Sequence, residues 1–263
     1  MKQVAAAKLK QQQNYTEGAR PFYNGISESV VFKTDKTIEI PEKGKQLRNA
    51  DSVPPSEGAD CLWVVCTSDK GLCGSLNTVL IRPIKTLLTK STRVVSLGGK
   101  GLNTLGDKQY DLWFVAKDLG KDPITFYEAS LIADRLLSTD RKKIFLFYNT
   151  FINVLTSRPT VNYVPSRQEI MEKDLDEYEF EEPAERTRKN LSDFFLACTV
   201  FHACVENACS EIGARMTSME TASNNAKDIV SDLTIEYNGR RQANINKELS
   251  ELVGGSETAR ADD

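Results

Sequence analysis

The sequence is short of histidine, a residue on which many catalytic and metal sites depend. Its 263 residues include one histidine, His202. A metal site with two imidazole ligands is therefore excluded, and a catalytic triad would have to use this residue. His202 lies in a helical pattern beside Phe201 and Val205. We therefore expect a packed histidine rather than a catalytic one.

An excess of basic charge and a long apolar run are also missing. The chain has 34 Lys and Arg against 37 Asp and Glu, for a net charge of −3. Proteins that bind nucleic acid backbones carry a marked basic excess or a basic face, so we expect no nucleic-acid partner. No apolar run approaches the ~20 residues that a membrane-spanning helix needs, so we expect no direct membrane insertion.

Common cofactor motifs are absent as well. After Gly99-Lys100-Gly101, the position of the third glycine of a dinucleotide fingerprint holds Thr104. Lys100 is followed by glycine rather than by the Ser or Thr of a phosphate-binding P-loop. Six cysteines are present, but no C-x-x-C motif occurs, and we interpret them as buried free thiols in a reducing compartment. The sequence thus predicts no catalytic residue, no cofactor and no metal.

The middle of the chain, residues 60–166, has the pattern of an α/β domain. Short β-rich runs alternate with helical stretches, one of which is expected to begin at Asp122-Pro123. This alternation predicts a Rossmann-like open sheet, mainly parallel and flanked by helices. The expected strands are Cys61 to Cys66, Arg93 to Leu97, Tyr110 to Ala116, Lys143 to Tyr148 and Thr160 to Val164.

The two ends of the chain predict a long antiparallel coiled coil. In residues 185–263, apolar or small residues recur from Leu191 to Leu233 in steps that average about 3.5 residues, the period of a coiled-coil seam. The available partner is a helix in residues 1–45, and the two helices must join the same domain at their inner ends. Residues 167–184 are expected to form a solvated acidic linker, because Glu169 to Glu182 hold eight carboxylates against one lysine.

Three stretches of the chain resemble one family, the gamma subunit of F-type ATP synthase. Met1-Lys2-Gln3-Val4-Ala5-Ala6-Ala7-Lys8 is similar to the family's M-x-M-V-A-A-A-K helix, and the run from Ser68 to Gly74 to its S-D-[KR]-G-L-C-G element. The run from Ala214 to Glu220, continued by Tyr237-Asn238, Arg241-Gln242-Ala243 and Lys247-Glu248-Leu249, is similar to its C-terminal helix. These stretches occur in the family's order over nearly the whole chain.

The resemblance implies a non-catalytic rotor. In the family, the gamma subunit is a central shaft that couples proton-driven rotation of a membrane ring to conformational cycling of catalytic sites on alpha and beta subunits. The implied partners are these subunits, small central-stalk subunits and the membrane proton-translocating ring. The implied location is the matrix side of the mitochondrial inner membrane, as a peripheral subunit. Residues 60–166 would be the foot of the shaft.

The resemblance also implies the residues that contact partners. Met1, Arg241, Gln242, Asn246 and Glu248 match family positions that face the catalytic subunits, although Asn246 stands where the family usually has threonine. In the family, further helix precedes the position that matches Met1, so the upper shaft of this chain is expected to be one helix. Two alternatives remain open from the residues alone, a nucleotide-binding α/β enzyme and a generic coiled-coil scaffold.

Overall fold

A computed structural model describes most of the chain, namely residues 2–28, 37–39, 61–89, 91–105, 110–119, 123–139, 143–173, 179 and 183–261. It divides into two units, Met1–Ser218 and Met219–Asp263, and each is described by itself. The helices of the described residues are α1 Lys2–Ser27, α2 Leu76–Leu87, α3 Gly99–Leu105, α4 Phe126–Leu137, α5 Arg167–Met171 and α6 Ala184–Ala261. The strands are β1 Thr37–Glu39, β2 Cys61–Cys66, β3 Arg93–Leu97, β4 Asp111–Ala116, β5 Lys143–Phe151 and β6 Ser157–Val164.

The first unit contains the expected open sheet, in the strand order β1-β6-β5-β2-β3-β4. Strands β2, β3, β4 and β5 pair in parallel, as expected for strands joined by crossover helices. Strand β6 returns antiparallel to β5 through a short hairpin, and β1 pairs antiparallel with β6. The sheet is therefore a parallel core with an antiparallel edge.

Alternating side chains of β2 show why the sheet needs cover on both faces. Because successive side chains of a strand point to opposite faces, Leu62 and Val64 enter one apolar cluster while Trp63 and Val65 enter another. Helices α2 and α3 cover the Trp63 face, and α4, α5 and α6 cover the Leu62 face. All six residues of β2 are buried, as the continuous apolar run predicts.

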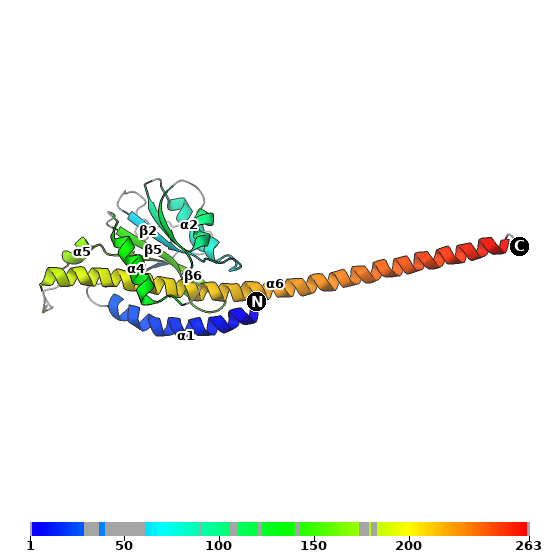
Figure 1. The fold of residues 1–263 in the computed structure, drawn as a ribbon, viewed down its shortest axis with the longest axis horizontal. Coiled ribbons are helices and arrows are strands. Elements are labelled where there is room, and N and C mark those ends of the chain that lie inside the picture. The colour runs from blue at the N-terminus through cyan, green and yellow to red at the C-terminus, as the bar shows by residue number, and fades with distance from the viewer. Residues whose placement is uncertain are drawn as a thin grey trace. The chain divides into compact units, whose positions relative to one another are not determined.

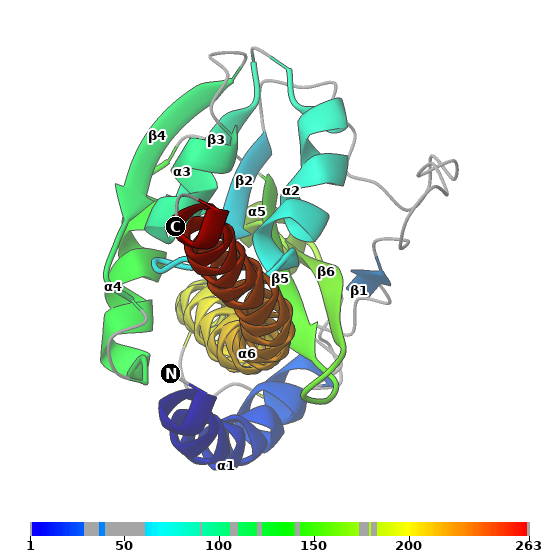
Figure 2. The same cartoon turned by 90° about the vertical axis from the view of Figure 1, so that its right-hand side faces the viewer.

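Helix α6 lies between the sheet and α1 in the first unit (Figures 1 and 2). Leu9 of α1 packs in one cluster with Cys209, Arg20 binds Glu206, and Tyr23 stacks on His202. Residue numbers rise along α1 as they fall along α6, so the two terminal helices are antiparallel. This part of the coiled-coil prediction is confirmed.

The predicted reach of the coiled coil needs correction. Helix α1 ends at Ser27 and β1 joins the sheet, so the range 1–45 is not one helix, and its remaining residues lie outside the described ones. Seam residues Ala222, Ala226, Ile229 and Leu233 are exposed. The physical reason is length: 26 helical residues of α1 span about 39 Å at 1.5 Å per residue, against about 117 Å for the 78 residues of α6.

Several further boundaries differ from the sequence predictions. Strand β4 begins at Asp111 rather than Tyr110, β5 continues to Phe151, and β6 begins at Ser157. The fourth helix begins at Phe126 rather than at Asp122-Pro123, because Thr125 and Glu128 form a capping box there. The range 167–184 begins with α5, whose Ile170 is fully buried in the core, so this part belongs to the folded domain. Residues 174–178 and 180–182 of the expected linker lie outside the described ones.

Candidate partner-contact site

The second unit carries four of the five residues predicted to contact partners. Arg241, Gln242, Asn246 and Glu248 lie on α6 within two helical turns, about 10 Å along the axis. Arg241 and Glu248, seven residues apart, share one face of the helix, while Gln242 and Asn246 share the adjacent face. Met1, the fifth residue, lies outside the described residues.

These four side chains are exposed. Within the described part of the chain, none of them makes a hydrogen bond or ion pair, whereas the neighbouring Arg240 pairs with Glu236 one turn earlier, with 2.5 Å between Nη2 and Oε1. A guanidinium with free donors can bind carboxylates or carbonyls of another protein in a bidentate manner. The structure therefore brings the four residues together as an unoccupied polar surface.

The same stretch of α6 exposes apolar side chains. Every described residue from Glu220 to Gly254 is exposed. The large apolar residues of this stretch are Ile229, Val230, Leu233, Ile235, Tyr237, Ile245, Leu249, Leu252 and Val253. An apolar surface of this extent, bordered by polar groups, is typical of a site of protein–protein interaction.

The motif segment Ser68 to Gly74 contacts the start of the run that begins at Ala214, within the first unit. Arg215 of α6 donates from Nε to the Gly71 carbonyl of the loop before α2, at 3.4 Å, and pairs with Glu211 one turn earlier. Burial raises the pKa of Glu211, and the paired guanidinium opposes this rise. Gly74 adopts a φ of 58°, and a Cβ there would lie 2.8 Å from Ser218 Oγ. The loop is thus seated tightly against α6.

The sequence does not predict that these two segments are in contact. Gly71 and Arg215 are 144 residues apart in the chain. The available hint was Arg215, which lies in a helical turn that otherwise packs against the domain. A guanidinium in such a position needs a nearby hydrogen-bond acceptor.

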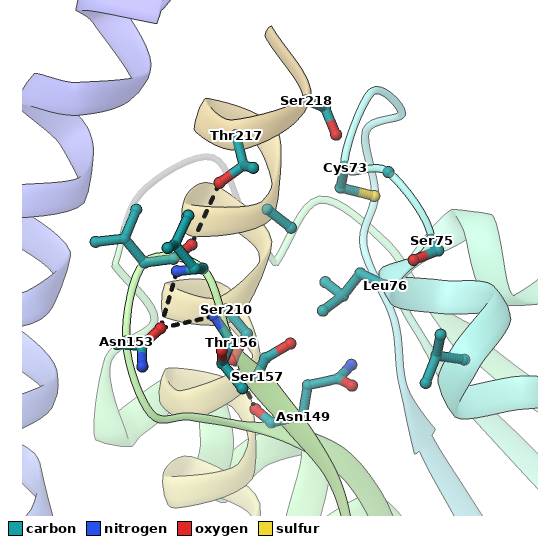
Figure 3. A pocket seen from close by; sticks show the side chains of 15 residues that line it. Cys73, Ser75, Leu76, Asn149, Asn153, Thr156, Ser157, Ser210, Thr217 and Ser218 are labelled. Carbon is teal, nitrogen blue, oxygen red and sulfur yellow. Dashed lines mark hydrogen bonds between the residues drawn. The ribbon is translucent and has the colours of Figure 1, made fainter. Parts of the chain in front are cut away.

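A cavity of about 530 Å³ lies beside this contact. Figure 3 shows that its walls come from the Cys73–Leu76 segment, the β5–β6 hairpin and α6. Asn153 Oδ1 accepts from the Thr156 amide at 2.8 Å, and Thr217 donates to the Val154 carbonyl at 3.3 Å. The lining consists of hydroxyl, amide, apolar and thiol groups and has no charged side chain. No group of three metal-ligating residues occurs in the described ranges.

His202, which the sequence predicts to be packed, is half-buried and packs against Tyr23 and Tyr148. All six cysteines are buried free thiols, as predicted. The site and the fold define a class of protein: a sheet domain with a long C-terminal helix, whose outer part exposes polar and apolar side chains. This is the build of a stalk subunit in a larger assembly.

Comparisons with known proteins identify the family. A family model described as ATP synthase matches residues 1–258. The ATP synthase gamma chain of Pelagibacter ubique is 33% identical over 273 residues, which cover 98% of this chain and 92% of the relative. The mitochondrial gamma subunit of Arabidopsis thaliana is 31% identical over 280 residues, which cover 99% of this chain and 80% of the relative.

Solved structures agree with this result. A chain of the central stalk and c-ring structure of the Tetrahymena thermophila mitochondrial ATP synthase matches with a TM-score of 0.65 and 25% identity, over 85% of this chain and 97% of that chain. A chain of the Euglena gracilis enzyme matches in fold, with a TM-score of 0.69 and 18% identity. The chain belongs to the ATP synthase gamma subunit family. It is a non-catalytic subunit of the central stalk.

Proposed function

We propose that the chain acts as a rotor shaft whose outer helix contacts the catalytic alpha and beta subunits through Arg241, Gln242, Asn246 and Glu248, and through Met1. The observation that carries this proposal is the exposed surface on α6, where these polar side chains have no partner among the described residues and exposed apolar side chains lie along the same helix. A shaft that contacts three catalytic subunits unequally stabilises a different conformation in each of them. Rotation then exchanges these conformations.

The sheet domain serves as the foot of the shaft in this proposal. Its partners are the small central-stalk subunits and the membrane proton-translocating ring. The Tetrahymena structure, which is described as central stalk and c-ring, supports this assignment.

Location follows from the relatives. Mitochondrial gamma subunits are among them, which supports a peripheral subunit of the mitochondrial complex. In the described ranges, no helix is both long enough and apolar enough to cross a membrane. We assign the chain to the matrix side of the inner membrane, and protease protection of the chain in intact inner-membrane vesicles of known orientation tests this.

The contact surface is tested with the joint variant Arg241→Ala and Gln242→Ala, assembled with alpha and beta subunits. Each lost hydrogen bond to a charged group costs about 1.5–3 kcal/mol, so ATP turnover is expected to fall by about tenfold or more. Arg240→Ala is the matched control, because Arg240 is already paired with Glu236.

The outcomes separate the rotor role from that of a generic scaffold. Unchanged turnover in the joint variant would favour a generic scaffold, in which these positions are merely solvated. Failure of the wild-type chain to associate with alpha and beta subunits would contradict the rotor role.

A further inference from the structure

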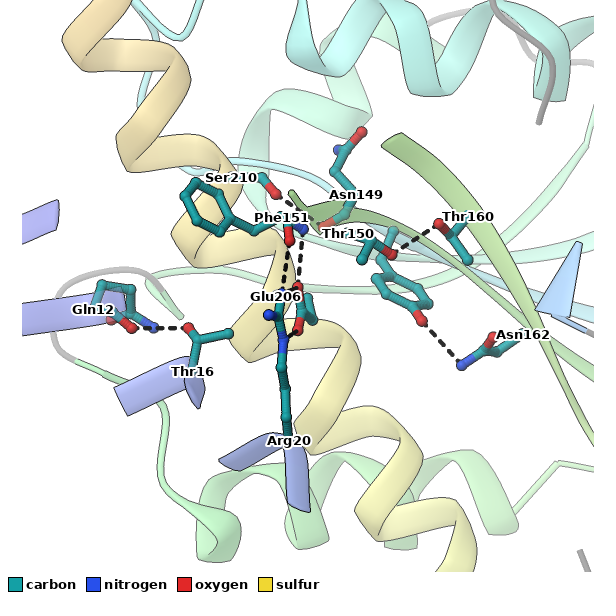
Figure 4. A network of polar contacts seen from close by, with 11 residues as sticks. Gln12, Thr16, Arg20, Asn149, Thr150, Phe151, Thr160, Asn162, Glu206 and Ser210 are labelled. Carbon is teal, nitrogen blue, oxygen red and sulfur yellow. Dashed lines mark hydrogen bonds and ion pairs between the residues drawn. The ribbon is translucent and has the colours of Figure 1, made fainter. Parts of the chain in front are cut away.

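One buried polar junction joins three elements of the first unit. Arg20 of α1 donates from Nε to Glu206 Oε1 at 2.6 Å and from Nη2 to Oε2 at 3.0 Å. The same Nη2 donates to the carbonyl of Phe151, the last residue of β5, at 2.6 Å. Glu206 Oε2 accepts from the Phe151 amide at 2.9 Å. Figure 4 shows the guanidinium, the carboxylate and this strand end converging.

The junction holds a charge where a charge is costly. The Glu206 side chain is only 1% exposed, and Arg20 is 37% exposed. A buried carboxylate is tolerated when both oxygens have partners, and here the guanidinium and the Phe151 amide supply them. The hydrogen bonds that Arg20 donates to the Glu206 carboxylate also raise the pKa of Arg20. Removal of either side chain leaves the other with unmet hydrogen bonds.

Part of the seam between α1 and α6 sets the register only weakly. Ala5 and Leu9 of α1 and Ala203 and Cys209 of α6 are small or apolar, and such contacts can be replaced by similar ones after a shift of one helical turn. The stack of Tyr23 on His202 is more specific. The bidentate pair cannot be replaced after such a shift, because among the described residues of α6 the positions one turn from Glu206 hold no carboxylate. Single buried polar groups set helix register in this manner.

The third partner gives the junction a mechanical role. The position of α6 on the sheet is set where Glu206 accepts from the Phe151 amide and Arg20 donates to the Phe151 carbonyl. Hydrogen bonds of Asn207 and Ser210 with Asn149 lie beside this junction. Force applied around the axis of α6 must pass to the sheet through such contacts. Apolar contacts resist sliding weakly, since they are not directional.

We propose that Arg20 and Glu206 are positioning residues for energy coupling: together they fix the register of α1 on α6 and transmit torque between α6 and the foot sheet. This proposal rests on the rotor function above. Arginine is required at position 20, because its planar fork reaches two carboxylate oxygens and a carbonyl at once, whereas lysine presents a single nitrogen.

The test uses the complete complex, reconstituted in vesicles with the full-length chain. ATP hydrolysis and ATP-driven proton pumping are measured on the same preparation for Arg20→Met, Arg20→Lys and Glu206→Gln. The control is Arg167→Met, which removes the exposed ion pair with Asp193. We expect the three junction variants to hydrolyse ATP and to pump fewer protons per ATP, with Arg20→Lys affected least, while the control keeps the wild-type ratio.

A wild-type ratio in Arg20→Lys and in every other junction variant that assembles overturns the proposal, even where the amount of assembled complex falls, because a purely structural role changes amount and not ratio. If one of the stronger variants does not assemble, Arg20→Lys decides the result. Failure of the rotor function itself looks different: in that case the complex with the wild-type chain pumps no better than a preparation without the chain.

Discussion

The imidazole ring of His202 stacks on the phenol ring of Tyr23, with ring centroids 4.1 Å apart and planes 8° from parallel. Tyr148 makes an edge contact with the same imidazole at 5.8 Å. Burial lowers the pKa of His202 to about 4; Glu206 opposes this shift and Arg20 adds to it. The one histidine of the chain is therefore a neutral aromatic side chain of α6 that packs against Tyr23 of α1.

This burial makes stability depend on pH. The pKa of His202 is 6.5 before perturbation and about 4 in the folded chain, so the unfolded chain binds a proton first as pH falls. The stabilisation from neutral His202 is complete above pH 6.5 and is lost progressively towards pH 4, by about 3 kcal/mol in total. In His202→Gln this loss is absent. Urea unfolding of both proteins at several pH values measures it, and a difference in unfolding free energy that does not vary with pH would contradict the prediction.

The capping box of α4 predicts a local loss of stability. Thr125 Oγ1 accepts from the Glu128 amide at 3.3 Å, and Glu128 Oε2 accepts from the Thr125 amide at 2.8 Å. Thr125→Ala is expected to cost about 1 kcal/mol of unfolding free energy, whereas Thr86→Ala, in the last turn of α2, is expected to cost less. The Thr125 hydrogen bonds lower the pKa of Glu128, so this pKa should rise in the variant. An NMR titration with no such rise would count against the box.

Two glycines of α3 form a matched pair. A Cβ at Gly101 would lie 2.5 Å from Ser96 Oγ and 2.6 Å from Thr67 Oγ1, both buried, whereas at Gly99 the nearest atom would be 3.6 Å away. Gly101→Ala should therefore destabilise the chain by about 1–3 kcal/mol. Gly99→Ala should be neutral or slightly stabilising, because alanine loses less backbone entropy. Equal melting temperatures of the two variants would contradict this prediction, because they would mean that the side chains around Thr67 can move to make room for the methyl group.

The buried thiols predict slow chemical modification. Hydrogen bonding to Cys204 and burial raise the pKa of Cys66, and burial raises that of Cys198 to about 12 and that of Cys209 to about 11. The thiolate is the reactive form, so a thiol reagent at neutral pH should label none of the six cysteines rapidly in the native chain and all six in denaturant. Leu72→Cys, at a position that is 64% exposed, serves as the positive control. Rapid labelling without that substitution would contradict the burial.

The sequence predicts best those elements whose own residues carry a clear apolar pattern. Both ends of strand β2 are predicted correctly, because both of its faces are covered and its apolar run is continuous. Helix α6 is predicted as one long helix because its apolar period persists over many turns. Strand β1 is too short for a pattern, and its pairing with β6 depends on tertiary structure. At α4, two capping signals compete over four residues, and Thr125 prevails because Glu128 completes its box.

The candidate site depends on different information. A single exposed helix has no local signal that distinguishes Arg241 from any solvated arginine, so its role came from family resemblance. Arg20 and Glu206 are 186 residues apart, and no spacing rule connects them. The available hint was a glutamate within the apolar seam of the C-terminal helix, since a charge on a buried face needs a partner from elsewhere.

The exposed stretch of α6 from Glu220 to Gly254 also has a consequence for the cellular abundance of this chain. In the described residues its own stabilising pairs are surface contacts such as Arg240 with Glu236 and Lys247 with Glu251, which contribute little. Helices without tertiary packing are marginal in water. A copy without its assembly therefore offers proteases an accessible helix and offers chaperones an apolar one. We therefore expect copies in excess of their partners to be degraded first, and the abundance of the chain to follow that of its partners.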